Sequence, residues 1–101
     1  MLRLLYAPSA TRDLRSIYRY ISGESGDGEV AAAFTERLRA RCRRLAELGG
    51  TMGRDRSELR RGLRSVPEGN YTILFRYNGR MLEILNIIHS ARNLRRMFPR
   101  P

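Results

Sequence analysis

Lysine is missing from this sequence, and all 20 basic residues are arginine. A coding bias toward GC-rich codons is enough to explain this. It still has a chemical consequence, because an arginine side chain stays protonated at neutral pH and cannot serve as a general base. With 10 acidic residues, the chain carries a formal net charge of +10. Such an excess predicts an acidic partner, either an anionic protein surface or nucleic acid, and it favours salt-dependent, non-specific contact with nucleic acid.

Cysteine and histidine occur only once each, as Cys42 and His89. A single cysteine cannot form a disulfide within the chain. One cysteine and one histidine also fall short of the ligand set of a zinc site. The glycine clusters near residues 49 and 53 lack the Lys and Ser/Thr of a phosphate-binding loop. We therefore expect no metal and no other cofactor.

Long apolar runs are absent as well. No segment approaches the roughly 20 apolar residues of a membrane helix, and the first residues do not resemble a signal peptide. We therefore expect a cytoplasmic, soluble protein without membrane contact. The length of 101 residues suits one domain, residues 1–101, and 42% hydrophobic residues can supply its core.

Two amphipathic helices are predicted in the first half of the chain, after a short strand over residues 2–7. Pro8 and Ser9 are suited to end that strand and cap a helix that runs to about Ser22. The outer side of this helix carries three arginines, Arg12, Arg15 and Arg19. A turn over residues 22–28 leads to the second helix, whose apolar stripe consists of Phe34, Leu38, Cys42, Leu45 and Leu48. Two such helices are expected to form an antiparallel hairpin on a flat layer.

The flat layer is predicted from strands over residues 63–68, 70–77 and 81–89, after a polar loop over 49–62 with a helical turn near 56–60. A two-residue loop at Asn78-Gly79 predicts the hairpin register. It pairs Tyr77 with Arg80, Phe75 with Leu82, Ile73 with Ile84 and Tyr71 with Asn86, and it places these residues and Ile88 under the helices. The opposite, half-polar face then carries Arg76, Glu83 and His89. The expected fold is α+β, with an N-terminal strand, the helical hairpin on a small, mainly antiparallel sheet, and a short C-terminal helix or tail.

The open face of this sheet allows two interpretations. In the first, Glu58, Arg64 and His89 form a ribonuclease site, where an acid–base pair moves the protons and arginine stabilises the phosphorane. In the second, Glu83 forms an ion pair with Arg76 across the hairpin, and His89 is an ordinary residue at a strand end. Perturbed charge clusters also occur for structural reasons, so the residues leave both interpretations open.

Three stretches in order carry a resemblance to a known family: SATRDLRSIYRYI (9–21), MGRDRSELRRGLRSVPEGNYTILFRY (52–77) and ILNIIHSARN (84–93). Together they resemble the ParE branch of the RelE/ParE superfamily of toxin–antitoxin (plasmid stabilisation) toxins. The likeness covers nearly the whole chain. Asn93 stands where the family usually has Asp, which removes one ion pair with an arginine.

The resemblance implies a cytoplasmic toxin that is not an enzyme and that inhibits DNA gyrase. It also implies neutralisation by a ParD-type antitoxin, whose acidic and apolar tail wraps the toxin in a heterotetramer. Residues 94–100 would take part in contact with the target. For binding of antitoxin or target we expect a set of charged residues: Arg12, Arg15, Arg19, Arg64, Arg76, Glu83, His89 and Arg92.

The RelE branch of the same superfamily implies an alternative, a ribosome-dependent mRNA endoribonuclease. Glu58, Arg64 and His89 match one of the catalytic sets of that branch. The chain lacks the lysines of the other set, and Ser90 stands where the matching set has tyrosine. The incomplete set favours binding over catalysis.

Overall fold

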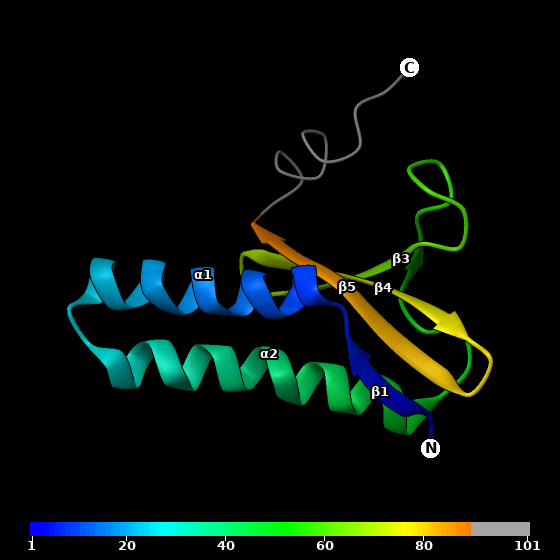
Figure 1. Cartoon of the computed structure of the whole chain (residues 1–101), viewed down its shortest axis with the longest axis horizontal. Helices are drawn as coiled ribbons and strands as arrows, with labels where there is room; N and C mark the ends of the chain where they lie inside the picture. The colour runs from blue at the N-terminus through cyan, green and yellow to red at the C-terminus, as the bar shows by residue number, and fades with distance from the viewer. Residues whose placement is uncertain (90–101) are drawn as a thin grey trace.

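The computed structural model describes residues 1–89, a helical hairpin packed on a five-stranded sheet (Figure 1). The elements are β1 (Arg3–Tyr6), α1 (Pro8–Ser25), α2 (Gly28–Leu48), β2 (Arg54–Asp55), β3 (Arg64–Glu68), β4 (Tyr71–Asn78) and β5 (Met81–His89). The sheet order is β1-β5-β4-β3-β2, with β1 parallel to β5 and the other pairs antiparallel. This confirms the predicted α+β fold. The predicted C-terminal helix or tail lies outside the described residues.

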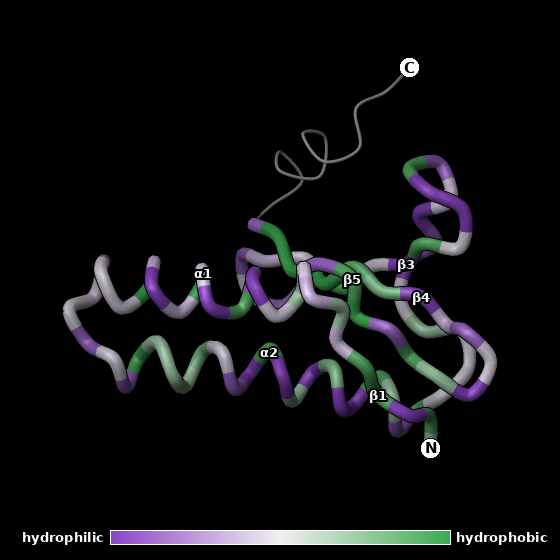
Figure 2. The backbone as a smooth tube through the Cα atoms, viewed as in Figure 1, coloured by the Kyte–Doolittle hydropathy of each residue, from purple (hydrophilic) through white to green (hydrophobic). Residues whose placement is uncertain are grey.

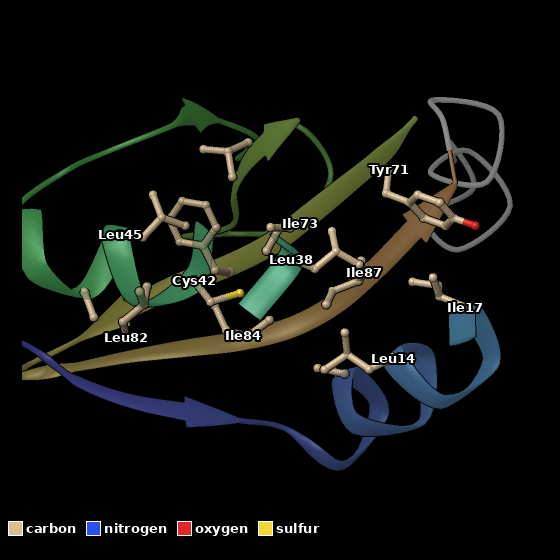
Figure 3. Close-up of a cluster of buried hydrophobic side chains, with 14 residues drawn as sticks. Leu14, Ile17, Leu38, Cys42, Leu45, Tyr71, Ile73, Leu82, Ile84 and Ile87 are labelled. Carbon is tan, nitrogen blue, oxygen red and sulfur yellow. The ribbon is translucent and has the colours of Figure 1, made fainter. Parts of the chain in front are cut away.

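The main core fills the space between the helices and the sheet (Figure 3). Leu38, Cys42 and Leu45 of α2 are at most 1% exposed and meet Ile73 and Ile84 from the two central strands. Burial raises the pKa of the Cys42 thiol to about 11, so the group stays a neutral, small apolar residue at physiological pH. The predicted stripe of α2 is thus confirmed for its central residues.

The ends of the two helices differ from the prediction. Ser9 does not cap α1; Ala7 is the N-cap, Pro8 begins the helix, and the Ser9 hydroxyl donates to the Leu85 carbonyl at 2.6 Å. Proline fits the first helical position because its fixed φ is helical and its missing N–H has no partner there. The helix also continues to Ser25, so the predicted turn over 22–28 shortens to two residues. Asp27 caps α2, as its side chain accepts from Glu29 N at 2.8 Å.

The register predicted for the β4–β5 hairpin is wrong. Tyr77 pairs with Leu82, two residues beyond the expected partner, because Asn78 pairs with Met81 and the turn lies at residues 79–80. A slip of two residues preserves which side chains face the helices. A register shift beside Leu74 then places Ile73 opposite Ile87. This β-bulge reverses the alternation at the end of β5, so Ile87, rather than Ile88, faces the helices.

The opposite face of the sheet carries a second, smaller apolar cluster. It consists of Leu63, Leu74 and Ile88, with Leu59 and Leu85 packed against them. Leu59 belongs to the turn after β2, where the amides of residues 59 and 60 donate to the Arg56 carbonyl at 2.9 and 3.2 Å. The helical turn expected near residues 56–60 is confirmed. The two-residue strand β2 was not predicted, because two residues carry no periodic pattern.

Along the chain, hydrophilic and hydrophobic residues alternate on both helices (Figure 2), as expected for helices with one buried face. No helix within residues 1–89 is long and apolar enough to cross a membrane.

Candidate functional site: two grooves and the separated nuclease residues

Arg64 connects β3 to the loop before β2. Its Nε donates to the Met52 carbonyl at 2.7 Å, and its guanidinium also donates to the Gly53 carbonyl at 2.9 Å. The Tyr77 hydroxyl accepts from Met52 N in the same loop at 3.0 Å. The guanidinium that was expected to contact a phosphate or a partner is therefore directed at backbone carbonyls, where it fixes the loop.

His89 ends β5 on the side of the helices, where its ring meets the edge of Tyr71 at a centroid distance of 5.1 Å. The prediction that His89 lies on the open face is wrong, because the bulge in β5 reverses the side-chain alternation before this residue.

The three residues of the nuclease hypothesis do not meet. Arg64 pairs with Phe75, whereas His89 pairs with Tyr71. Four residues along a strand separate these positions by about 13 Å. Glu58 lies in the exposed turn between β2 and β3, next to Leu59 on the opposite face of the sheet. The structure therefore assembles no acid–base pair from this set.

Arg76 and Glu83 form the ion pair that the second interpretation expected. They are direct partners in the hairpin, and Arg76 Nε donates to Glu83 Oε1 at 2.7 Å. Both side chains are partly exposed, so the pair stabilises the hairpin by at most about 1 kcal/mol. Each charge compensates the other, which makes this pair a weaker candidate for partner binding than a guanidinium without a counter-charge.

Asp13 on α1 holds the bulge in place, a role that the sequence did not reveal. Its Oδ2 accepts from Ile87 N at 2.9 Å and from Asn86 Nδ2 at 3.1 Å. A bulge locally disrupts the hydrogen bonds of the sheet, and buried N–H groups need a partner. The only signal in the sequence was an acidic residue between the outer arginines and the apolar stripe of α1.

Removing the Asp13 carboxylate is expected to destabilise the protein. Asp13→Ala leaves Ile87 N without its acceptor and should lower the free energy of unfolding by about 1–3 kcal/mol. Asp13→Asn keeps a side-chain oxygen and should cost clearly less. Urea unfolding of the two variants measures the difference, and equal losses would contradict the assigned role.

A first groove surrounds His89. Two recesses of about 260 and 390 Å³ share Tyr20, Tyr71 and His89 in their linings. One extends along α1 past Ile17, and the other reaches Phe34 of α2. Tyr20 is 61% exposed, so an aromatic surface is accessible at the end of β5.

A second groove runs between α1 and α2 and has a volume of about 540 Å³. Its lining residues are Leu14, Arg15, Tyr18, Arg19, Ala32, Thr35, Glu36 and Arg39. Arg15 and Arg19 were predicted as binding residues. Arg12 is exposed one turn earlier on α1 but does not line the groove. Arg39 was missed because the arginine run of residues 37–44 was interpreted as a solvated face.

Glu36 is the one acidic residue in the lining of the second groove, and Arg43 engages it. Glu36 Oε1 accepts from the Arg43 guanidinium at 2.5 Å. This hydrogen bond and the nearby positive charge lower the pKa of Glu36. The groove therefore presents the guanidiniums of Arg15, Arg19 and Arg39 as its main charge. The remaining predicted binding residue, Arg92, lies outside the described residues.

Comparisons with known proteins agree with this fold. Residues 4–94 match the family described as the ParE toxin of the type II toxin–antitoxin system parDE. Toxin ParE3 of Caulobacter vibrioides is 33% identical over 92 residues, which cover 91% of this chain and 90% of that protein.

Solved structures show the same arrangement. The chromosomal ParDE system of P. aeruginosa includes a chain with a TM-score of 0.73 and 25% identity, covering 89% of this chain and 97% of the other. A chain of the RelBE2 toxin–antitoxin complex of Mycobacterium tuberculosis has a TM-score of 0.54 at 21% identity, covering 88% and 98%. For the RelB–RelE complex of Methanococcus jannaschii the values are 0.57 and 17%, covering 94% and 99%. The last two likenesses concern the fold alone.

Proposed function

The chain belongs to the ParE toxin family of type II toxin–antitoxin systems, and on this premise we propose that it is a toxin that acts by binding its target. The proposed target is DNA gyrase, and the proposed regulator is a ParD-type antitoxin that neutralises the toxin by direct contact. The observation that carries the binding mode is the separation of Glu58, Arg64 and His89. A general acid or base must reach the proton that it transfers, and these side chains lie in different parts of the fold.

Charge and surface support an antitoxin as partner. The net charge of +10 favours association with an acidic protein. The groove between the helices adds a recess lined by arginine and apolar residues. The similar P. aeruginosa structure is of a ParDE system. We propose that the complex contains two toxins on an antitoxin dimer, and its mass in solution tests this stoichiometry.

The toxicity of a double variant tests the binding mode. Glu58→Gln with His89→Asn removes the acid–base groups of the nuclease hypothesis and keeps side chains of similar size. We expect growth arrest equal to that of the wild-type chain when the two are expressed at the same level. Arg64 is left unchanged, because its hydrogen bonds to the 51–53 loop make any substitution there a test of stability.

Loss of growth arrest in this double variant would contradict the proposal, provided that the protein is soluble and unfolds at the wild-type temperature. That result would favour the ribosome-dependent endoribonuclease of RelE type. Single variants would then show whether the carboxylate or the imidazole carries the effect.

A further inference from the structure

The groove between α1 and α2 has positive charge on its rim that no described acidic residue neutralises. Within residues 1–89, the salt bridges engage Arg37, Arg43, Arg44 and Arg76. None of them involves Arg15, Arg19 or Arg39, the three guanidiniums of the groove. Their charges come from both helices and converge on the same recess. Such an arrangement attracts an anionic partner and places its charges at defined positions.

The floor of the same groove is mainly apolar. Leu14 and Thr35 form its buried part with exposed fractions of 5% and 4%, and the ring of Tyr18 on the rim is 40% exposed. Ala32 contributes a methyl group on the open side. The volume of about 540 Å³ is large enough to admit side chains of a partner. A phosphate backbone would engage the arginines but would leave this recess unfilled, so the lining favours a peptide over nucleic acid.

We propose that this groove is the docking site for an acidic, amphipathic segment of the antitoxin. An apolar side chain of that segment enters the recess between the helices, and carboxylates on either side of it pair with Arg15, Arg19 and Arg39. Binding then combines apolar burial at the centre with ion pairs at the rim. The inference rests on the proposed neutralisation by an antitoxin, and it specifies which surface of this chain that partner occupies.

A pair of alanine substitutions on α2 tests the recess without changing the charge. Ala32→Trp places a large side chain in the groove, whereas Ala33→Trp places the same side chain on an exposed neighbouring position that does not line it. The probe is the protein encoded by the acidic reading frame adjacent to the toxin gene. We expect Ala32→Trp to raise the Kd for this protein at least tenfold and Ala33→Trp to change it less than twofold. Both alanines are exposed, so thermal unfolding should show that both variants fold.

A charge-reversal pair tests the rim. The triple substitution of Arg15, Arg19 and Arg39 by Glu should raise the Kd at least a hundredfold at low salt. The matched control replaces Arg54, Arg60 and Arg61 by Glu, which changes the net charge equally on exposed residues far along the chain. We expect a change below about threefold in this control. Equal losses in the two triple variants would overturn the proposal, because they would reflect net charge alone.

The remaining outcomes separate this inference from the proposed function. Binding of the antitoxin with the same Kd to wild type and Ala32→Trp would overturn the groove and leave the antitoxin partnership intact. Absence of binding to the wild-type chain would overturn both. Saturable binding of a short DNA duplex that the groove triple variant loses and Ala32→Trp retains, together with unchanged antitoxin binding in both, would assign the groove to nucleic acid and overturn the peptide.

Discussion

Gly53→Ala is expected to destabilise the protein by roughly 2–4 kcal/mol, since it combines backbone strain with overpacking. Gly53 has a φ of +77°, which an L-residue rarely adopts. A Cβ at this position would lie 2.7 Å from the Ser65 carbonyl oxygen, 2.8 Å from Phe75 Cζ and 3.0 Å from Val66 Cγ1. Two of these neighbours belong to the core, which has no space to yield.

Gly50→Ala is the matched control for this prediction. Gly50 lies in the same loop and has a φ of +70°, but no heavy atom lies within 4 Å of its added Cβ. It should show only the cost of the left-handed backbone, about 1 kcal/mol. The difference between the two variants in urea unfolding therefore measures the contact of the loop with Phe75. Equal losses would mean that the loop does not pack on the core as described.

The second large effect is expected at the centre of α2. Leu38 is 0% exposed and belongs to the main core. Leu38→Ala should lower the free energy of unfolding by about 2–5 kcal/mol, since it removes buried methyl groups and leaves a cavity. Leu48 belongs to the same predicted stripe but is 48% exposed at the end of the helix. Leu48→Ala should therefore change stability by less than about 1 kcal/mol.

Chemical denaturation of these two leucine variants checks the layer arrangement directly. A loss at Leu48 as large as that at Leu38 would show that the end of α2 is covered. A small loss at Leu38 would contradict the position of the core between helices and sheet.

Much of this fold could be predicted because periodicity reports which side of an element is buried. The repeat of Leu38, Cys42 and Leu45 identified the inner side of α2. The bulge in β5 could not be predicted in the same way. Its segment, ILNIIH, is apolar at almost every position, so it contains no alternation from which an extra residue can be located. That one residue determined the side on which His89 lies.

Contacts between distant elements account for the other errors. The Asp13 carboxylate reaches a strand more than 70 residues away in sequence, and a helical pattern does not show such a partner. Arg64 matched a catalytic position in the RelE branch, yet its donors go to carbonyls of residues 52 and 53. The stretch MGRDRSELRRGLRS therefore has a structural explanation: its glycine packs on Phe75, and Arg64 and Arg56 hold the loop.

The interhelical groove was predicted only in part. Arg15 and Arg19 were selected from α1 alone, because they lie on its outer side. Arg39 joins them through the packing of α2 against α1, and that relation is a property of the folded hairpin. Such a site is found from structure, since each helix separately shows only an exposed arginine.

The central claim is that the toxin acts by binding rather than by cutting RNA. Its most direct test is to induce the wild-type chain in cells and map, in the same samples, the 5′ ends of mRNA and the DNA breaks covalently linked to gyrase. We expect gyrase-linked breaks and an mRNA end profile equal to that of uninduced cells. Codon-specific mRNA cleavage without gyrase-linked breaks would contradict the account.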